Sequence, residues 1–259
     1  MMENKLANAY YSGTSGLILP VPNKEFYPIE FKDKSRLCYY SSLMNSIEIN
    51  SSFYKIPQPS TVKKWLTEVH PDFKFTFKLF KEITHSKNLI FDQNLTNLFF
   101  TAINQVNNQK GCLLVQLPPS IRIGNFKQLE NLMFSLTNHN EEPQWKIAFE
   151  FRHPSLYVNE VYELLKSFNL GLVMHDKGIA STPVMQVETD FVYLRFHGPG
   201  GNYRGSYEDD VLSEYAGYIA DWLGQNKQVF LYFNNTMGNA YSNLNTLSAM
   251  VNEKISILL

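Results

Sequence analysis

Short runs of apolar residues, rich in β-branched and aromatic side chains, recur along the chain at nearly regular intervals. Runs of this length and composition are typical of buried strands. Eight are present, at residues 9–16, 46–54, 73–79, 111–118, 146–152, 170–176, 191–198 and 228–235. Between them, apolar residues at helical spacing predict helices at residues 34–45, 60–70, 94–107, 126–137, 156–168, 207–225 and 239–251. The pattern predicts repeated strand–helix units around a parallel sheet.

The interval between the sixth and seventh runs differs from the others. Residues 176–191 include Gly178 and Pro183, and both residue types interrupt helices. The interval is also too short for a loop, a full helix and a second loop. We therefore expect a degenerate sixth helix there.

Eight strand–helix units favour a closed (β/α)8 barrel of the TIM type, an α/β fold that typically takes about 250 residues. The chain has 259 residues, and no Gly/Ser run, Pro-rich stretch or block of like charge indicates a linker. The sequence therefore predicts a single barrel domain over residues 1–259. An open doubly wound sheet uses the same local pattern and is the alternative fold.

Alternation within the strands predicts a polar rim inside the barrel. In the second and fifth runs, apolar residues alternate with charged or amide residues, so one parity faces the helices and the other faces the interior. Barrel proteins carry their ligand sites at the carboxyl ends of the strands. The inward-facing polar residues nearest that end are Glu48, Asn50, Lys78, Gln116, Glu150, Arg152, Arg195, His197, Tyr232 and Asn234.

Composition limits the compartment and the partners. The 23 basic and 24 acidic residues leave a formal net charge of -1, which provides no general attraction to nucleic acid or to an anionic membrane. We expect neither as a partner, so any anion site must be local. The two cysteines, Cys38 and Cys112, fit reduced thiols and a cytoplasmic setting. The sequence shows no signal-peptide pattern and no apolar window of membrane-spanning length.

Several short motifs occur in a fixed order along nearly the whole chain. They are GTSG at 13–16, EFYP at 25–28, EINSSFYKIPQPSTVKKW at 48–65, FKFTFKLFKEITH at 73–85, VQLPPS at 115–120, FEFRHPS at 149–155, FVYLRFHGPGG at 191–201 and YFNN at 232–235. Together they resemble the YecE-like family, domain of unknown function 72. The resemblance implies a TIM-barrel-like fold and no established reaction. The segments LILPVPNK at 17–24 and TMGNA at 236–240 depart from the family pattern.

A glycine-rich segment, HGPGGNYRGSY at 197–207, follows the seventh run. Barrel proteins often bind phosphate at this point through backbone N–H groups, and Arg195 and Arg204 would add charged donors. This segment is the predicted anion site. A plain glycine turn is the alternative, because the segment lacks the spacing of a P-loop.

Glu48 and Glu150 lie near the ends of two different strands. They can serve as general base and general acid if their surroundings separate their pKa values, with His197 as a proton shuttle. The structural alternative is a buried ion-pair network, with Glu150 paired to Arg195 and Glu48 paired to Lys78.

A metal site is a further alternative, built from Glu48, Glu150, Asp176 and one histidine, as in sugar isomerase barrels. The cationic residues of the same rim would compete with the metal for these carboxylates. The sequence also lacks HExxH, GxGxxG, Walker, GxSxG and CxxC patterns. We therefore expect no metal and no cofactor.

These features predict an enzyme-like barrel that binds or acts on a small polar anionic molecule, such as a sugar phosphate or a carboxylated polyol, by acid–base chemistry. The predicted catalytic residues are Glu48, Glu150 and His197. The predicted ligand-binding residues are Asn50, Lys78, Gln116, Arg152, Arg195, Gly198, Gly200, Gly201, Arg204, Tyr232 and Asn234. A non-catalytic metabolite-binding protein, a metal-dependent isomerase or hydrolase, and a nucleic-acid-processing barrel are the alternatives.

Overall fold

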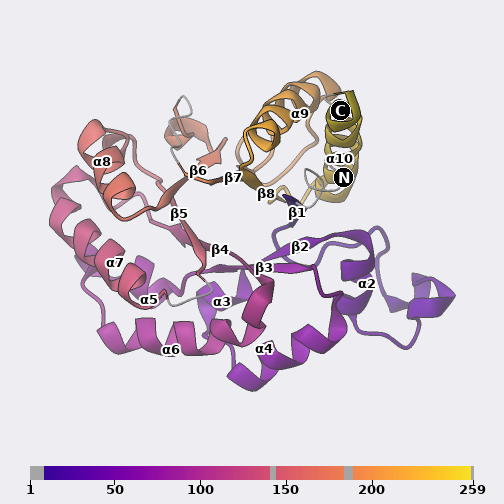
Figure 1. Ribbon diagram of the computed structural model, residues 1–259, viewed down its shortest axis with the longest axis horizontal. Coiled ribbons are helices and arrows are strands. Elements are labelled where there is room, and N and C mark those ends of the chain that lie inside the picture. Colours follow the sequence, from indigo (N-terminus) through magenta and orange to yellow (C-terminus); the bar gives the residue numbers. More distant parts are fainter. Residues whose placement is uncertain (1–8, 141–143, 184–188, 258–259) are drawn as a thin grey trace.

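Eight parallel strands form the centre of the computed structural model, which describes residues 9–140, 144–183 and 189–257. The strands are β1 (Tyr10–Thr14), β2 (Ser46–Ile49), β3 (Lys74–Lys78), β4 (Lys110–Gln116), β5 (Lys146–Glu150), β6 (Gly171–His175), β7 (Phe191–Phe196) and β8 (Gln228–Phe233). Figure 1 shows them around a common axis with the helices outside. Each strand matches one of the eight predicted runs, although β4 begins one residue earlier than its run, at Lys110.

The strands are hydrogen bonded in the order β1-β8-β7-β6-β5-β4-β3-β2. Strands β1 and β2, at the two ends of this order, meet at a bridge between Ser15 and Glu48. A side chain reinforces this seam, because Asn45 Oδ1 accepts a hydrogen bond from the backbone N–H of Ser12 at 2.8 Å. The sheet therefore forms a nearly closed TIM-like barrel, and the prediction of a barrel rather than an open sheet is confirmed.

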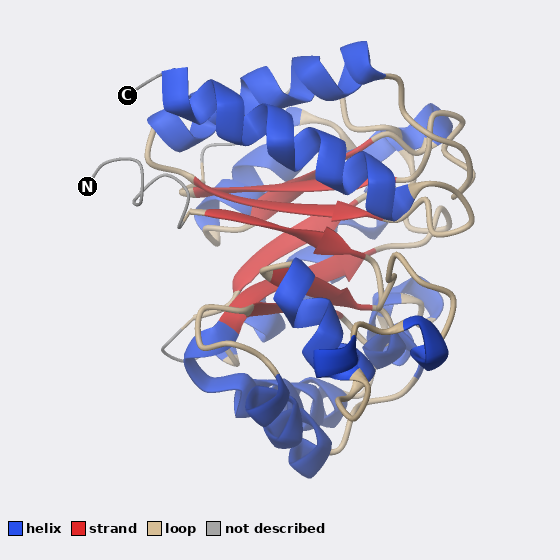
Figure 2. Ribbon diagram, turned by 90° about the vertical axis from the view of Figure 1, so that its right-hand side faces the viewer, coloured by secondary structure: helices blue, strands red, loops and turns tan. Residues whose placement is uncertain are grey.

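Among the described residues, seven α-helices longer than one turn surround the strands, and each overlaps a predicted helix. They are α2 (Arg36–Leu43), α4 (Pro59–Trp65), α6 (Gln93–Ile103), α7 (Phe126–Asn138), α8 (Asn159–Ser167), α9 (Asp209–Gly224) and α10 (Ala240–Ile257). Figure 2 shows helices on both sides of the strands and all visible arrowheads pointing toward one end, where loops gather. That end is the carboxyl-terminal rim, at which the ligand site is expected.

The second strand is shorter than predicted, and the assignment of residues 51–54 to a strand is wrong. Strand β2 ends at Ile49, and Ser51–Tyr54 form a short helix, α3. The hydroxyl of Ser52 donates to the carbonyl oxygens of Ile49 at 2.8 Å and Lys78 at 2.7 Å. Such local side-chain bonds compete with a strand ladder, so the chain turns at the rim.

Two apolar layers stabilise the barrel. Phe149 and Phe151 belong to the larger layer between the strands and the helices. The barrel interior holds a separate cluster formed by Cys112, Leu114, Ala148, Val173, Phe191, Tyr193, Phe230 and Tyr232. The predicted alternation of β5 is confirmed, because Glu150 lies between the two outward phenylalanines and its carboxylate contacts Arg195 inside the barrel.

The interval between β6 and β7 contains one short 3-10 turn, η8 (Gly178–Ala180), within its described residues. The prediction of a degenerate sixth helix therefore agrees with the structure at residues 176–183 and 189–191. Residues 184–188 lie outside the described part of the chain. None of the described helices combines the length and the apolar character needed to cross a membrane.

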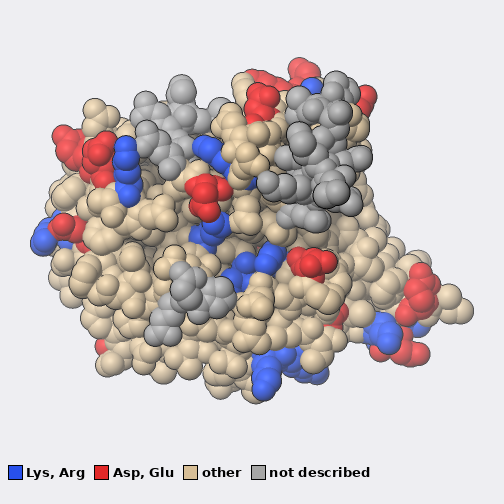
Figure 3. All heavy atoms as spheres, in the orientation of Figure 1, with Lys and Arg blue, Asp and Glu red and all other residues tan. Residues whose placement is uncertain are grey.

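Lysines begin three consecutive strands: Lys74 in β3, Lys110 in β4 and Lys146 in β5. Figure 3 shows the face seen in Figure 1, where the strands begin, and Lys and Arg atoms gather near its middle. Lys146 is paired there with Asp190 at 2.5 Å. The barrel therefore carries cationic side chains at both ends, and the polar rim described next lies at the opposite end.

Candidate functional site

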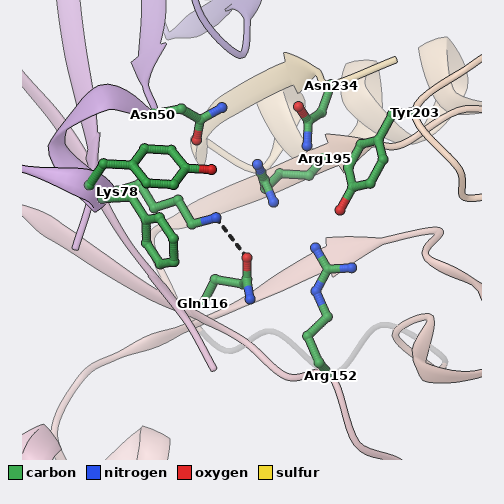
Figure 4. A pocket seen from close by; sticks show the side chains of 9 residues that line it. Asn50, Lys78, Gln116, Arg152, Arg195, Tyr203 and Asn234 are labelled. Carbon is green, nitrogen blue, oxygen red and sulfur yellow. Dashed lines mark hydrogen bonds between the residues drawn. The ribbon is translucent and has the colours of Figure 1, made fainter. Parts of the chain in front are cut away.

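A pocket of about 180 Å³ opens at the carboxyl ends of the strands. Its walls are Asn50, Phe53, Tyr54, Lys78, Gln116, Arg152, Arg195, Tyr203 and Asn234. Figure 4 shows the labelled side chains converging on one space from several strands and their following loops. Six of the predicted ligand-binding residues meet here: Asn50, Lys78, Gln116, Arg152, Arg195 and Asn234.

Arg195 holds together the floor of the pocket. It is 2% exposed, and its guanidinium contacts both Glu48 and Glu150, which are fully buried. The Arg195 Nη1–Glu150 Oε2 distance is 2.5 Å. Ser15 and Tyr193 also donate their hydroxyl hydrogens to Glu48. The two carboxylates therefore lie beneath the pocket, and neither is one of its lining residues.

The surroundings of the two carboxylates keep both ionised. Burial works against ionisation, but Arg195 and its hydrogen bonds hold the pKa of Glu48 below its ordinary value. The Arg195 and Arg152 guanidinium groups likewise outweigh burial and hold the pKa of Glu150 well below its ordinary value. The two pKa values move in the same direction, whereas an acid–base pair needs them to move apart.

The predicted ion-pair network is present, with one partner exchanged. Glu150 pairs with Arg195 as predicted. The pairing of Glu48 with Lys78 is wrong, because Glu48 is bound by Arg195 and Lys78 Nζ donates to Gln116 Oε1 at 2.7 Å. Glu48 pairs with Arg195 because the arginine side chain extends from β7 across the barrel interior. Its planar guanidinium can bind two carboxylates at once.

His197 links this network to the loop after β6. Its ring Nε2 lies 3.0 Å from Arg152 Nη2 and 3.2 Å from Arg195 Nη1. Since both guanidinium groups are donors, Nε2 accepts, and the proton of the neutral ring belongs on Nδ1, which lies 3.3 Å from Asp176 Oδ1. Burial lowers the pKa of His197. A neutral His197 therefore fixes the two arginines that face the pocket.

Arg152 has donors to spare. Its Nη2 forms a close ion pair with Glu150, while Nε and Nη1 are buried without a hydrogen-bond partner. The Oδ1 atom of Asn50, on the facing wall, is also buried without a partner. Unpartnered buried polar atoms are rare in folded proteins because each one raises the free energy. A bound polar ligand would satisfy these atoms.

The glycines of the glycine-rich segment do not line the pocket. The N–H of Gly198 donates to the Tyr207 hydroxyl at 2.6 Å, and the N–H of Gly201 donates to the Gly198 carbonyl at 2.7 Å. Gly200 and Arg204 are exposed. Neither Gly198 nor Gly201 therefore offers its N–H to a ligand in this conformation, and the plain-turn alternative describes this part of the segment.

Packing explains why glycines occur here. Gly198 has φ +95°, and a Cβ at this position would lie 2.1 Å from the carbonyl oxygen of Arg204. Gly201 has φ +64°, and a Cβ there would lie 2.9 Å from the N of Gly178. These close approaches allow the segment to fold back so that Tyr203 reaches the pocket.

Tyr232 lies deeper than predicted. It is fully buried, and its hydroxyl contacts Ser46 Oγ at 2.6 Å and Thr76 Oγ1 at 2.7 Å in the barrel interior. Inward-facing residues of β8 are two positions apart, so Asn234 occupies the rim and Tyr232 lies one layer below it. The expected position of Tyr232 at the mouth is therefore wrong.

Three aromatic residues of the pocket were not predicted. Phe53 and Tyr54 come from α3, the helical turn that the alternation pattern assigns to a strand. Tyr203 comes from the glycine-rich segment, where Lys177 Nζ lies 3.8 Å from the centre of its ring. The sequence signal for all three is their place in segments that follow a strand end, since such segments build the mouth of a barrel.

The metal alternative does not match the donor atoms. Arg195 and Arg152 occupy the carboxylates of Glu48 and Glu150, and Asp176 accepts hydrogen bonds from His197 and Tyr207. The described residues contain no group of three or more His, Cys, Asp or Glu side chains arranged to hold a metal ion. The arrangement suits an anion better than a cation.

Two known bacterial proteins with similar sequences both carry the family name UPF0759. The UPF0759 protein YecE of Escherichia coli (strain K12) is 26% identical over 140 residues, which cover 54% of this chain and 48% of that protein. That alignment thus spans about half the length of the relative. The UPF0759 protein YunF of Bacillus subtilis (strain 168) is 26% identical over 242 residues, covering 82% of this chain and 84% of YunF.

Solved structures show the same fold. A DUF72 family protein from Enterococcus faecalis V583 superposes with a TM-score of 0.75 at 18% identity, covering 94% of this chain and 95% of that chain. A DUF72 family protein from Thermotoga maritima MSB8 gives a TM-score of 0.74 at 23% identity, covering 93% and 98%. The family profile described as "Protein of unknown function DUF72" matches residues 11–258, which confirms the resemblance seen in the motifs. The chain belongs to the DUF72 family.

Proposed function

We propose that the protein binds a small polar molecule carrying a phosphate or carboxylate group in the rim pocket and acts on it by acid–base chemistry. A sugar phosphate or a carboxylated polyol has the matching chemistry. One observation carries the proposal: the nine lining residues include the cations Lys78, Arg152 and Arg195 and no acidic side chain. A wall rich in charged donors suits a ligand rich in acceptor oxygens.

The unpartnered atoms of Arg152 strengthen the proposal. Its side chain is 7% exposed, so Nε and Nη1 are largely withdrawn from water and still lack a partner. An anion that accepts from them restores a hydrogen bond that the folded protein otherwise lacks. Asn50, Gln116 and Asn234 offer amide groups around the same space, which suits the hydroxyl groups of a polyol (Figure 4).

In the proposed function, the charged groups behind the pocket and those in its wall have different roles. Glu48 and Glu150 are buried and ionised, which suits groups that hold Arg195 and Arg152 in position. Their roles as general base and general acid stay predictions, as does the role of His197. Within the pocket wall, burial and Arg195 lower the pKa of Lys78 to about 8, which brings a proton-exchanging group closer to neutral pH.

Isothermal titration with inorganic phosphate, glycerol phosphate and gluconate tests the proposal, with glycerol as the neutral control. Arg152→Gln should weaken anion binding by about 2 kcal/mol, or roughly thirtyfold in Kd, because it removes charge-assisted donors. Arg204→Gln is the matched control, since Arg204 is exposed and outside the pocket. Its Kd should equal that of the wild type.

Two results would contradict the proposal. One is that folded Arg152→Gln binds every anion as well as the wild type does. The other is that Arg204→Gln, rather than Arg152→Gln, weakens binding. That result would place the anion site in the glycine-rich segment. Anion binding without turnover in a screen of phosphorylated and carboxylated sugars would favour the non-catalytic metabolite-binding protein.

A further inference from the structure

Lys78 occupies an unusual position for a lysine. It is the last residue of β3, and its side chain ends inside the rim pocket. Its Nζ donates to the neutral amide oxygen of Gln116 at 2.7 Å and lies 4.2 Å from the centre of the Phe53 ring. Figure 4 shows the amine directed toward Gln116, on the same space that Arg152 and Arg195 face.

The nearby carboxylates are already bound by arginines. Glu48 is held by Arg195, and Glu150 is held by Arg195 and Arg152. Lys78 therefore lies beside two fixed cations and is bonded to an amide, so its protonated form is less stable than that of a lysine in water. The pKa of about 8 that burial and Arg195 impose leaves roughly a tenth of the amines neutral at pH 7.

We infer that Lys78 is an amine nucleophile that condenses with the carbonyl group of an aldehyde or ketone whose phosphate or carboxylate group is held by Arg152. The inference rests on the proposed function and narrows its ligand class to carbonyl compounds. Desolvation of a lysine next to other cations is one of the ways in which proteins activate it as a nucleophile.

The condensation is balanced without a further reactant. The lone pair of neutral Nζ forms a bond to the carbonyl carbon, and the carbonyl oxygen takes up a proton to give a carbinolamine. The C–O bond then breaks as this oxygen takes a second proton and leaves as water. Nitrogen loses two protons overall, so one amine and one carbonyl group give one imine and one water.

Reductive trapping tests the inference. The full-length protein is incubated at pH 7.5 with glycolaldehyde phosphate or pyruvate and sodium cyanoborohydride, and the adduct is located by peptide mass spectrometry. Lys78 should be modified about tenfold faster or more than Lys127, an exposed lysine on α7 that pairs with Glu130. Inorganic phosphate should slow the modification of Lys78 and leave that of Lys127 unchanged.

Variants separate this inference from the proposed function. Lys78→Arg should lose the adduct at this position while still binding phosphate in a titration. Arg152→Gln should keep the amine but lose the preference for anionic carbonyl compounds over neutral glycolaldehyde. If the wild type binds phosphate and Lys78 is modified no faster than Lys127, the inference is wrong and the anion site stands. If phosphate does not bind and Lys78 shows no selectivity, both are wrong.

Discussion

The guanidinium group of Arg195 meets the carboxylate of Glu48 through two hydrogen bonds, Nη2 to Oε1 at 2.7 Å and Nε to Oε2 at 2.8 Å. The remaining nitrogen, Nη1, binds Glu150 at 2.5 Å. One cation thus separates two buried anions that would repel each other strongly at low local dielectric. The floor of the pocket therefore contributes to the stability of the fold as well as to the chemistry of the pocket.

Arg195→Met should therefore destabilise the protein by about 3–5 kcal/mol, because it leaves two buried carboxylates without their shared partner. Urea unfolding followed by circular dichroism measures the change. Lys127→Met, at an exposed ion pair, is the control and should change the free energy of unfolding by less than about 0.5 kcal/mol. A loss below about 1 kcal/mol for Arg195→Met would show that the pairs carry little net stability.

The stability should fall on mild acidification because of His175. Lys177 N–H donates to Nδ1 of this ring at 3.2 Å, and Nε2 lies 3.0 Å from the Phe151 carbonyl, so both nitrogens are engaged by a neutral ring. Burial lowers the pKa of His175 to about 4. Between pH 6.5 and 4, His175 binds a proton in the unfolded chain but not in the folded protein. The free energy of unfolding therefore decreases as the pH decreases.

From pH 7 to pH 5, His175 should account for a loss of about 2 kcal/mol. His175→Gln should reduce this pH dependence in urea titrations, whereas His70→Gln, at an exposed position, should retain it. The buried His197 acts in the same direction, so part of the slope should remain in His175→Gln. Equal slopes in the wild type and His175→Gln would contradict the prediction.

Two glycines should respond oppositely to alanine. At Gly198 the added Cβ meets the backbone oxygen of Arg204 at 2.1 Å, and φ is +95°, so Gly198→Ala should lower the free energy of unfolding by about 2 kcal/mol or more. At Gly217, in α9, nothing lies within 4 Å of the added Cβ. Gly217→Ala should stabilise the protein by about 0.5–1 kcal/mol, because alanine favours helix. Thermal unfolding of both variants checks the pair.

Tyr232→Phe distinguishes the barrel interior from the pocket. The variant removes a hydroxyl that bonds to Ser46 and Thr76, so stability should fall by about 1–2 kcal/mol. Phosphate affinity should not change, because Tyr232 lies below the pocket. If the folded variant binds phosphate more weakly than the wild type, Tyr232 contributes to the ligand site and the prediction is wrong.

The sequence predicts the barrel well because strand alternation is a local property. At the end of β5, Phe149 and Glu150 face opposite sides, and Phe151, the residue after the strand, faces the same side as Phe149. The rim residues Lys78 and Arg152 could be identified for the same reason, since each ends or follows a strand.

Other features depend on contacts between distant segments and could not be predicted. Ser52 turns the chain at the rim by bonding to the carbonyl of Lys78, which lies on the next strand. Arg195 reaches Glu48 rather than leaving it to Lys78, and residue types alone do not distinguish these pairings. The glycine-rich segment also shows this limit, because its glycines allow close backbone packing that the sequence pattern cannot separate from anion binding.

The seam between β1 and β2 has a consequence for the motions of the barrel. Backbone N–H groups of β1 are bonded there to side chains, Thr14 to the Tyr40 hydroxyl and Ser12 to Asn45, each at 2.8 Å. Protection of these amides from hydrogen exchange thus depends on rotatable side chains rather than on a neighbouring strand. Glu48 lies at the same seam and beneath the pocket. A ligand that steadies Arg195 should therefore slow exchange in β1, so that occupancy of the pocket can be detected in a strand the ligand does not touch.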